Sequence, residues 1–94
     1  MHLLLIAAIA LQPATIIDVQ ADRVVTLTLR FTDTFYTAEF SRRDLKPDSF
    51  KEGDRVQAEV KGNHLTVKRT DGRRVTGRII QVQRVIVHPI PDIP

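Results

Sequence analysis

The sequence predicts an all-β protein, a small antiparallel barrel of six short strands with one short helical turn between the third and fourth strands. Apolar and polar residues alternate along several stretches, most clearly in residues 24–31 (VVTLTLRF). Such alternation is typical of strands with one buried and one solvated face, hence of an antiparallel sheet. Glycine-containing turn signals separate these stretches, and 94 residues suffice for one domain with a small core.

Residues 1–14 (MHLLLIAAIALQPA) are predicted to be a signal peptide. Their apolar run is far shorter than the ~20 residues of a membrane-spanning helix, but it fits the apolar region of an export signal. Small residues permit cleavage after Ala10, within the A-x-A pattern, or after Ala14. We therefore expect export to the bacterial periplasm or beyond, and no transmembrane segment. Because no Lys or Arg precedes the apolar run, a buried N-terminal strand or helix of the domain is the alternative.

Residues 15–88 are predicted to form the barrel. The first strand is expected at residues 15–20, with Ile17 and Val19 pointing inward. In the next two strands the inward residues are expected to be Val25, Leu27, Leu29 and Phe31, followed by Tyr36, Ala38 and Phe40. The change from odd to even numbers requires a connecting loop of two or four residues. Pairing Phe31 with Tyr36 and Leu29 with Ala38 satisfies this parity.

Residues 42–53 break the alternation, and Pro47 and Gly53 exclude a long helix there. We expect one helical turn that plugs the barrel with Leu45 and Phe50. Beyond it, the predicted inward residues are Val56, Ala58, Val60, Leu65 and Val67. Gly62 and Asn63 then form a two-residue turn, which pairs Val60 with Leu65 and Ala58 with Val67.

The last hairpin needs an odd loop, because Val67 and Val75 are both odd-numbered and both apolar. A three-residue turn over residues 70–72, with Gly72 left-handed, places Val67 opposite Val75. The alternation slips at Ile79 and Ile80, which predicts a bulge there. Residues 85–87 are expected to extend the strand, and residues 89–94 to form an extended, proline-containing tail.

These registers predict a basic face on the last three strands. The outward residues fall into three rows: Gln57, Lys68, Arg74; Glu59, Thr66, Thr76; and Lys61, His64, Arg78. Like charges directly opposite one another destabilise a sheet, so their placement suggests an anionic ligand. Residues 61–94 carry a net charge of +5 against −2 for residues 1–60, and ten of the fourteen bases are arginine, whose planar fork suits phosphate, sulfate and carboxylate. The alternative is that the long basic side chains only cover the sheet and keep it soluble.

Signatures of catalysis or metal binding are missing from the sequence. There is no cysteine, and the three histidines are scattered without metal-ligand spacing. No serine has His and Asp companions arranged for nucleophilic catalysis. We predict no enzyme activity, no metal and no cofactor. For nucleic acid, an exposed aromatic platform is missing, since only Phe35, in an expected turn, looks free of the core.

The chain resembles OB-type small barrels over about residues 16–69. The resemblance is carried by YTAEFSRRDL and SFKEGDRVQAEVKGNHLTVKR, which are similar to transport-associated and ribosomal-type OB modules; GDRV at residues 53–56 also occurs in SH3-like barrels. It implies a barrel core ending near residue 70, with the sixth strand as an addition. The transport modules carry a Thr-x-x-Ser element where this chain has Ser41, Arg42, Arg43 and Asp44, which argues against molybdate-type binding.

Together these observations predict an exported, non-enzymatic binding module. Its ligand is expected to be an anionic polymer or an acidic protein, held by Lys61, His64, Lys68, Arg74 and Arg78. Two alternatives stay open: a structural or accessory protein whose charges only solubilise it, and a nucleic-acid-binding OB domain.

Overall fold

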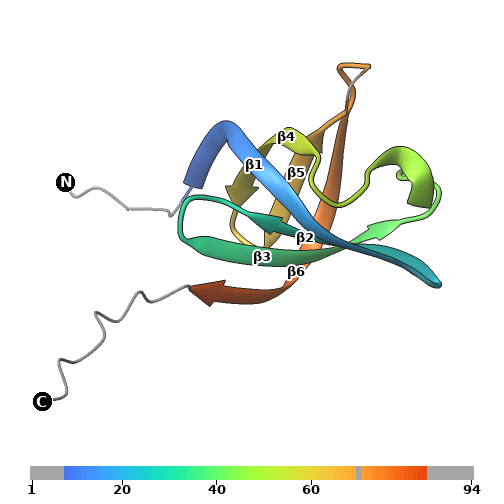
Figure 1. The fold of residues 1–94 in the computed structure, drawn as a ribbon, viewed down its shortest axis with the longest axis horizontal. Helices are drawn as coiled ribbons and strands as arrows, with labels where there is room; N and C mark the ends of the chain where they lie inside the picture. The colour runs from blue at the N-terminus through green and yellow to red at the C-terminus, as the bar shows by residue number, and fades with distance from the viewer. Residues whose placement is uncertain (1–7, 70, 85–94) are drawn as a thin grey trace, which may run out of the picture.

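The computed structural model describes residues 8–69 and 71–84, which form a closed barrel of six antiparallel strands (Figure 1). The elements are β1 (Ala8–Ala21), β2 (Val24–Arg30), β3 (Thr34–Ser41), the 3-10 turn η1 (Pro47–Ser49), β4 (Arg55–Lys61), β5 (His64–Lys68) and β6 (Arg74–Arg84). The predicted all-β class, the six strands and the helical turn between the third and fourth strands are confirmed. The predicted strand extension at residues 85–87 and the tail at 89–94 lie outside the described residues.

Two three-stranded meanders make up the barrel, in the order β1-β2-β3-β6-β5-β4. Antiparallel pairing of β1 with β4 and of β3 with β6 joins the meanders and closes the sheet. This order is compatible with an OB-like barrel. The expectation that the sixth strand is an addition to a core ending near residue 70 is wrong, because β6 lies between β3 and β5 and closes one of the two seams.

The barrel interior is filled by the alternating apolar residues that the sequence predicted. Val25, Leu27 and Leu29 of β2 are fully buried, as are Leu65 and Val67 of β5. The connector between β3 and β4 contributes the predicted plug, Leu45 at 0% exposure and Phe50 at 6%. No polar side chain is buried among the described residues, so the side chains of the core contribute to stability through apolar burial.

The inward residues of the first strand differ from the prediction. Ile16 is fully buried whereas Ile17 is 37% exposed, so the expected inward position of Ile17 is wrong. The pairing of β1 with β2 shifts between Ile16 and Asp18, which makes Ile17 the extra residue of a β-bulge. The bulge restores the inward direction at Val19, which packs against the core.

β1 also begins earlier than residue 15, at Ala8. Its C-terminal part pairs with β2, and its N-terminal part pairs with β4, from Ala8 opposite Lys61 to Thr15 opposite Arg55. Ala14 is 3% exposed and belongs to the core. Both predicted cleavage sites therefore lie within a strand of the barrel, and cleavage itself stays a prediction. Residues 1–7 of the predicted leader lie outside the described part of the chain.

The hairpin between β2 and β3 keeps the predicted parity but not the predicted partners. Tyr36 pairs with Leu29, not with Phe31, and Ala38 pairs with Leu27. The loop is the shorter of the two permitted lengths, because the Phe31 N–H donates to the Thr34 carbonyl oxygen at 2.9 Å across a two-residue turn. The Phe31 and Tyr36 rings still meet, edge to face with centroids 5.3 Å apart, as diagonal neighbours.

The two hairpins of the second meander have the predicted registers. Val60 lies opposite Leu65, Ala58 opposite Val67, and Val67 opposite Val75. Gly62 has φ +61° in the first hairpin, and Gly72 has φ +89° in the second. The bulge expected near Ile79 and Ile80 is also present, because Thr37 pairs with Gln81 while Ala38 pairs with Ile79.

Candidate anion-binding surface

The five predicted site residues lie on the outward face of β4, β5 and β6. Pairing places Gln57, Lys68 and Arg74 in one row across the three strands, Glu59, Thr66 and Thr76 in the next, and Lys61, His64 and Arg78 in the third. All five predicted residues, Lys61, His64, Lys68, Arg74 and Arg78, are exposed. We call these five residues the basic face.

Charge is distributed unevenly over the basic face. Lys68 lies directly opposite Arg74, an unfavourable like-charge pair. Arg74 reaches across to Glu59, with 3.4 Å between Nη1 and Oε1, and its side chain remains 55% exposed. In the third row, Arg78 has Glu39 of β3 as its neighbour on the other side. Each outer row therefore has a carboxylate near one of its cations, and Lys68 has no acid among its direct cross-strand partners.

The middle row separates the two cationic rows with hydroxyl groups. Thr66 and Thr76 lie opposite each other, and their Oγ1 atoms are 2.8 Å apart, within a hydrogen bond. Cross-strand threonine pairs of this kind stabilise a sheet without adding charge. The row ends at Glu59. An anion on the face would therefore meet cations at the two sides, and two hydroxyl groups and one carboxylate in the middle.

Three surface depressions lie near the basic face, and most of their charged lining residues were not predicted as site residues. The first, of about 380 Å³, is lined by Arg30 and Arg55 together with Pro13 and other β1 residues. The second, of about 500 Å³, is lined by Arg55, Lys68 and Arg69, with Pro13 and Val56 as its apolar part. The third, of about 440 Å³, is lined by Arg43, Asp44, Arg69, Arg73 and Arg74.

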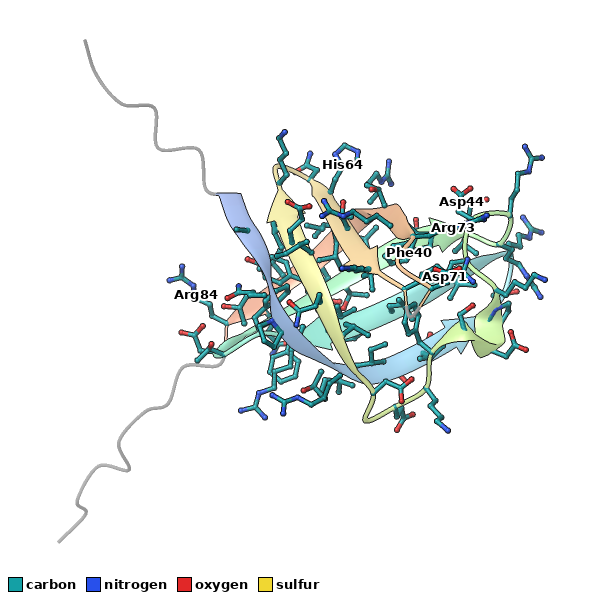
Figure 2. The ribbon with its side chains drawn as sticks, turned by 90° about the horizontal axis from the view of Figure 1, so that it is seen from above. Phe40, Asp44, His64, Asp71, Arg73 and Arg84 are labelled. Atoms are coloured by element: carbon teal, nitrogen blue, oxygen red, sulfur yellow. The ribbon has the colours of Figure 1, made fainter. Side chains whose placement is uncertain are left out.

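The turn between β5 and β6 holds two of these arginines at defined positions. The Arg69 N–H donates to the Arg73 carbonyl oxygen at 2.7 Å, and the Gly72 N–H donates to the Arg69 carbonyl oxygen at 2.9 Å. Asp71 accepts a hydrogen bond from the Arg73 N–H at 2.9 Å and lies 3.7 Å from the Arg69 guanidinium. Figure 2 shows Asp44, Asp71 and Arg73 gathered at one end of the barrel and Arg84 at the other.

Sequence reasoning missed these arginines for two reasons. Arg69 and Arg73 flank a recognised turn, so their proximity could have been inferred from the three-residue loop alone. Arg30 belongs to β2, Arg55 to β4, and Arg43 to the connector after β3. Only the closure of the barrel places them at depressions that share lining residues. A hairpin register relates neighbouring strands and carries no information about the β1–β4 seam.

The aromatic residue expected to be free, Phe35, is not in a turn. It lies within β3, is half-buried, and has the Arg30 guanidinium carbon 5.9 Å from its ring centroid. This cation–π contact occupies the ring face and holds the Arg30 guanidinium beside the first depression. Phe31 also lines that depression but is only 5% exposed.

Residues 8–69 and 71–84 contain no group of three or more His, Cys, Asp or Glu side chains placed to hold a metal ion. Within the same residues, no helix has the length and apolar character needed to cross a membrane. Comparison of the chain with protein-family models, curated proteins and solved structures found no match.

Proposed function

We propose that the protein is a non-enzymatic binding module that holds an anionic polymer, or an acidic segment of a partner protein, through the basic face. One observation carries the proposal: the register of β5 and β6 places Lys68 directly opposite Arg74. Glu59, 3.4 Å from Arg74, offsets part of the repulsion in the free protein, and an anion lying between the two side chains would remove the rest.

The arginine content of residues 61–94 supports the same ligand class. Five of the seven bases among residues 61–94 are arginine, and their guanidinium groups form paired hydrogen bonds with carboxylate, sulfate or phosphate. Arg69 is half-buried and the other six side chains are exposed, so each contact is weak and sensitive to salt. Affinity would then come from several contacts with one polymer.

Retention on immobilised heparin and on immobilised single-stranded DNA at rising salt tests the proposal. We expect the wild type to be retained at low salt, and the double variant Lys68→Glu with Arg74→Glu to elute at clearly lower salt. The matched control is Lys46→Glu with Lys51→Glu, which makes the same change in net charge at exposed positions of the connector. Equal elution of both variants would mean that only net charge matters, and this result would support the solubilising role of the basic residues.

We further propose that the protein acts after export, with its leader removed after Ala10. The β1–β4 pairing, which shifts between Ile9 and Gln12, supports the first of the two candidate sites. Cleavage after Ala10 leaves the regular pairs from Gln12 to Thr15 in place, whereas cleavage after Ala14 removes all of these pairs except the one at Thr15. The intact mass of the protein recovered from the periplasmic or secreted fraction tests this. A chain that retains Met1 there would contradict it.

A further inference from the structure

The three depressions are joined into one path over the surface. The first and second share Pro13 and Arg55, and the second and third share Arg69. Two neighbouring cross-strand rows lie along the path: Arg30, Thr15 and Arg55 in one, and Pro13, Gln57, Lys68 and Arg74 in the other. At about 4.8 Å between strands, the second row alone extends over roughly 14 Å. We call this path the arginine groove.

One sign of charge dominates the arginine groove. Its lining includes six arginines and Lys68, against the single carboxylate of Asp44. Asp71 and Glu59 lie outside the lining and pair with Arg69 and Arg74, respectively. The other lining cations, Arg55 and Arg73 among them, form no ion pair with another described residue. Hollows lined by one sign of charge concentrate the electric field and raise the local concentration of an oppositely charged ligand.

The arginine groove shares Lys68 and Arg74 with the basic face and runs away from the other three residues of that face. None of the three depressions, as formed by the described residues, is lined by Lys61, His64 or Arg78. Arg78 also has Glu39 as a cross-strand neighbour, which lowers the positive potential there. A long polyanion seated on the Lys68–Arg74 row therefore gains more from following the groove than from crossing the sheet.

We infer that the arginine groove binds an acidic polysaccharide, a flexible sugar chain carrying sulfate or carboxylate groups. Guanidinium forks suit both groups. Pro13 supplies an exposed apolar ring in the middle of the path, against which the C–H face of a sugar can pack. Single-stranded nucleic acid fits less well, because its binding uses exposed aromatic rings. Among the described residues that line the groove, Phe31 is the only aromatic one and it is buried, and the Arg30 guanidinium lies over the Phe35 ring.

This inference rests on the proposed function, since Lys68 and Arg74 belong to both surfaces. Two matched double variants separate them. The groove variant is Arg55→Glu with Arg73→Glu, and the face variant is Lys61→Glu with Arg78→Glu. All four residues are exposed, none has a side-chain hydrogen bond or ion pair in the described structure, and the two variants change the net charge equally. Circular dichroism and thermal unfolding establish that both variants remain folded.

The measurement is the dissociation constant for a heparin-derived oligosaccharide at several salt concentrations. We expect the groove variant to bind about tenfold more weakly than the wild type, and to lose about one unit of salt-dependence slope for each lost contact. The face variant should lose clearly less. Equal losses, or a larger loss in the face variant, would overturn the groove while leaving the proposed function intact. If the Lys68→Glu, Arg74→Glu variant binds the oligosaccharide as tightly as the wild type does, the proposed function itself is wrong.

A second set of binding measurements tests the class of ligand. An oligothymidylate and a polyglutamate of the same formal charge as the oligosaccharide are measured in the same buffer. Weaker binding of both, with the larger loss of oligosaccharide binding in the groove variant, supports the polysaccharide. Binding of the oligothymidylate that is equal to or tighter than that of the oligosaccharide would overturn the polysaccharide in favour of nucleic acid. The same outcome for polyglutamate would overturn it in favour of an acidic protein segment.

Discussion

Replacing Gly77 with alanine adds one methyl group at the one glycine whose Cβ position is already crowded by neighbouring atoms. Gly77 lies in β6 opposite Leu65, and its inward face meets Phe40 of β3. A Cβ atom built there would lie 2.6 Å from the Glu39 carbonyl oxygen, and 2.8 Å and 2.9 Å from two ring carbons of Phe40. All three distances are under 3.0 Å, so either β3 or β6 must move.

The expected cost of this change is large for a protein of this size. Overpacking a core costs about 1–3 kcal/mol, and we expect the upper end because one clashing atom belongs to the backbone and cannot rotate away. A domain of about eighty residues has a free energy of unfolding of roughly 4–12 kcal/mol. A loss of about 3 kcal/mol corresponds to a fall of roughly 12–24 °C in Tm.

Urea denaturation followed by far-ultraviolet circular dichroism measures this loss, since the chain has no tryptophan for fluorescence. The midpoint should fall while the m-value stays constant, because the folded structure is weakened and not replaced. Gln81→Ala, at an exposed position of the same strand, is the matched control and should stay within about 0.5 kcal/mol of the wild type.

Phe40→Leu provides a second check on the cause. Phe40 is 1% exposed, so shortening it is destabilising by itself. It also removes the ring carbons that the new methyl group would meet, so the double variant should lose about 1 kcal/mol less than the sum of the single losses. Strict additivity would assign the cost to the Glu39 carbonyl alone. A Gly77→Ala protein as stable as the control would refute the close packing of β3 on β6.

Three further predictions concern the barrel seam, the plug and the last turn. A chain that starts at Leu11 should unfold cooperatively in a thermal melt. A chain that starts at Thr15 should lose this transition, because it lacks most of the β1–β4 pairs. Equal melting of the two chains would contradict the pairing of β1 with β4. Leu45→Ala should cost about 2–5 kcal/mol in urea denaturation, since Leu45 is fully buried, and a loss below about 1 kcal/mol would show that the connector does not plug the barrel. Gly72→Ala should lower the free energy of unfolding by about 1–2 kcal/mol, because φ at this position is +89°. The cross-strand nuclear Overhauser contacts between Lys68 and Arg74 should also weaken. Unchanged contacts and unchanged stability would contradict the strained turn.

Local sequence rules predicted the second meander, β4 to β6, almost completely. Alternation identified the inward residues of β4 and β5, and parity required a three-residue loop before Val75, which is the register observed. Each inference used residues close in sequence and a short turn, whose length sets the pairing directly. The basic rows follow from those registers, so the alignment of Lys68 with Arg74 was predictable.

The same rules failed to select the correct structure where two local structures fitted the apolar alternation. Loops of two and of four residues both satisfied the parity between β2 and β3, and the structure has the two-residue turn closed by Phe31 and Thr34. At the adjacent apolar residues Ile16 and Ile17 the alternation predicted that Ile17 points inward, and this was wrong because a bulge places Ile16 in the core instead. In both places the packing of the whole barrel selects one of the alternatives.

By itself the sequence determined the all-β class, most of the inward residues, the two turns of the second meander and the rows of the basic face. Those features depend on the side-chain period of a strand and on backbone angles that only glycine adopts readily. The tertiary structure alone decided the closure of the barrel, in which β1 extends back to Ala8 to pair with β4 and β6 joins β3. That closure places Arg30, Arg43 and Arg55 along one groove, because the pairing of strands distant in sequence depends on how the complete core packs.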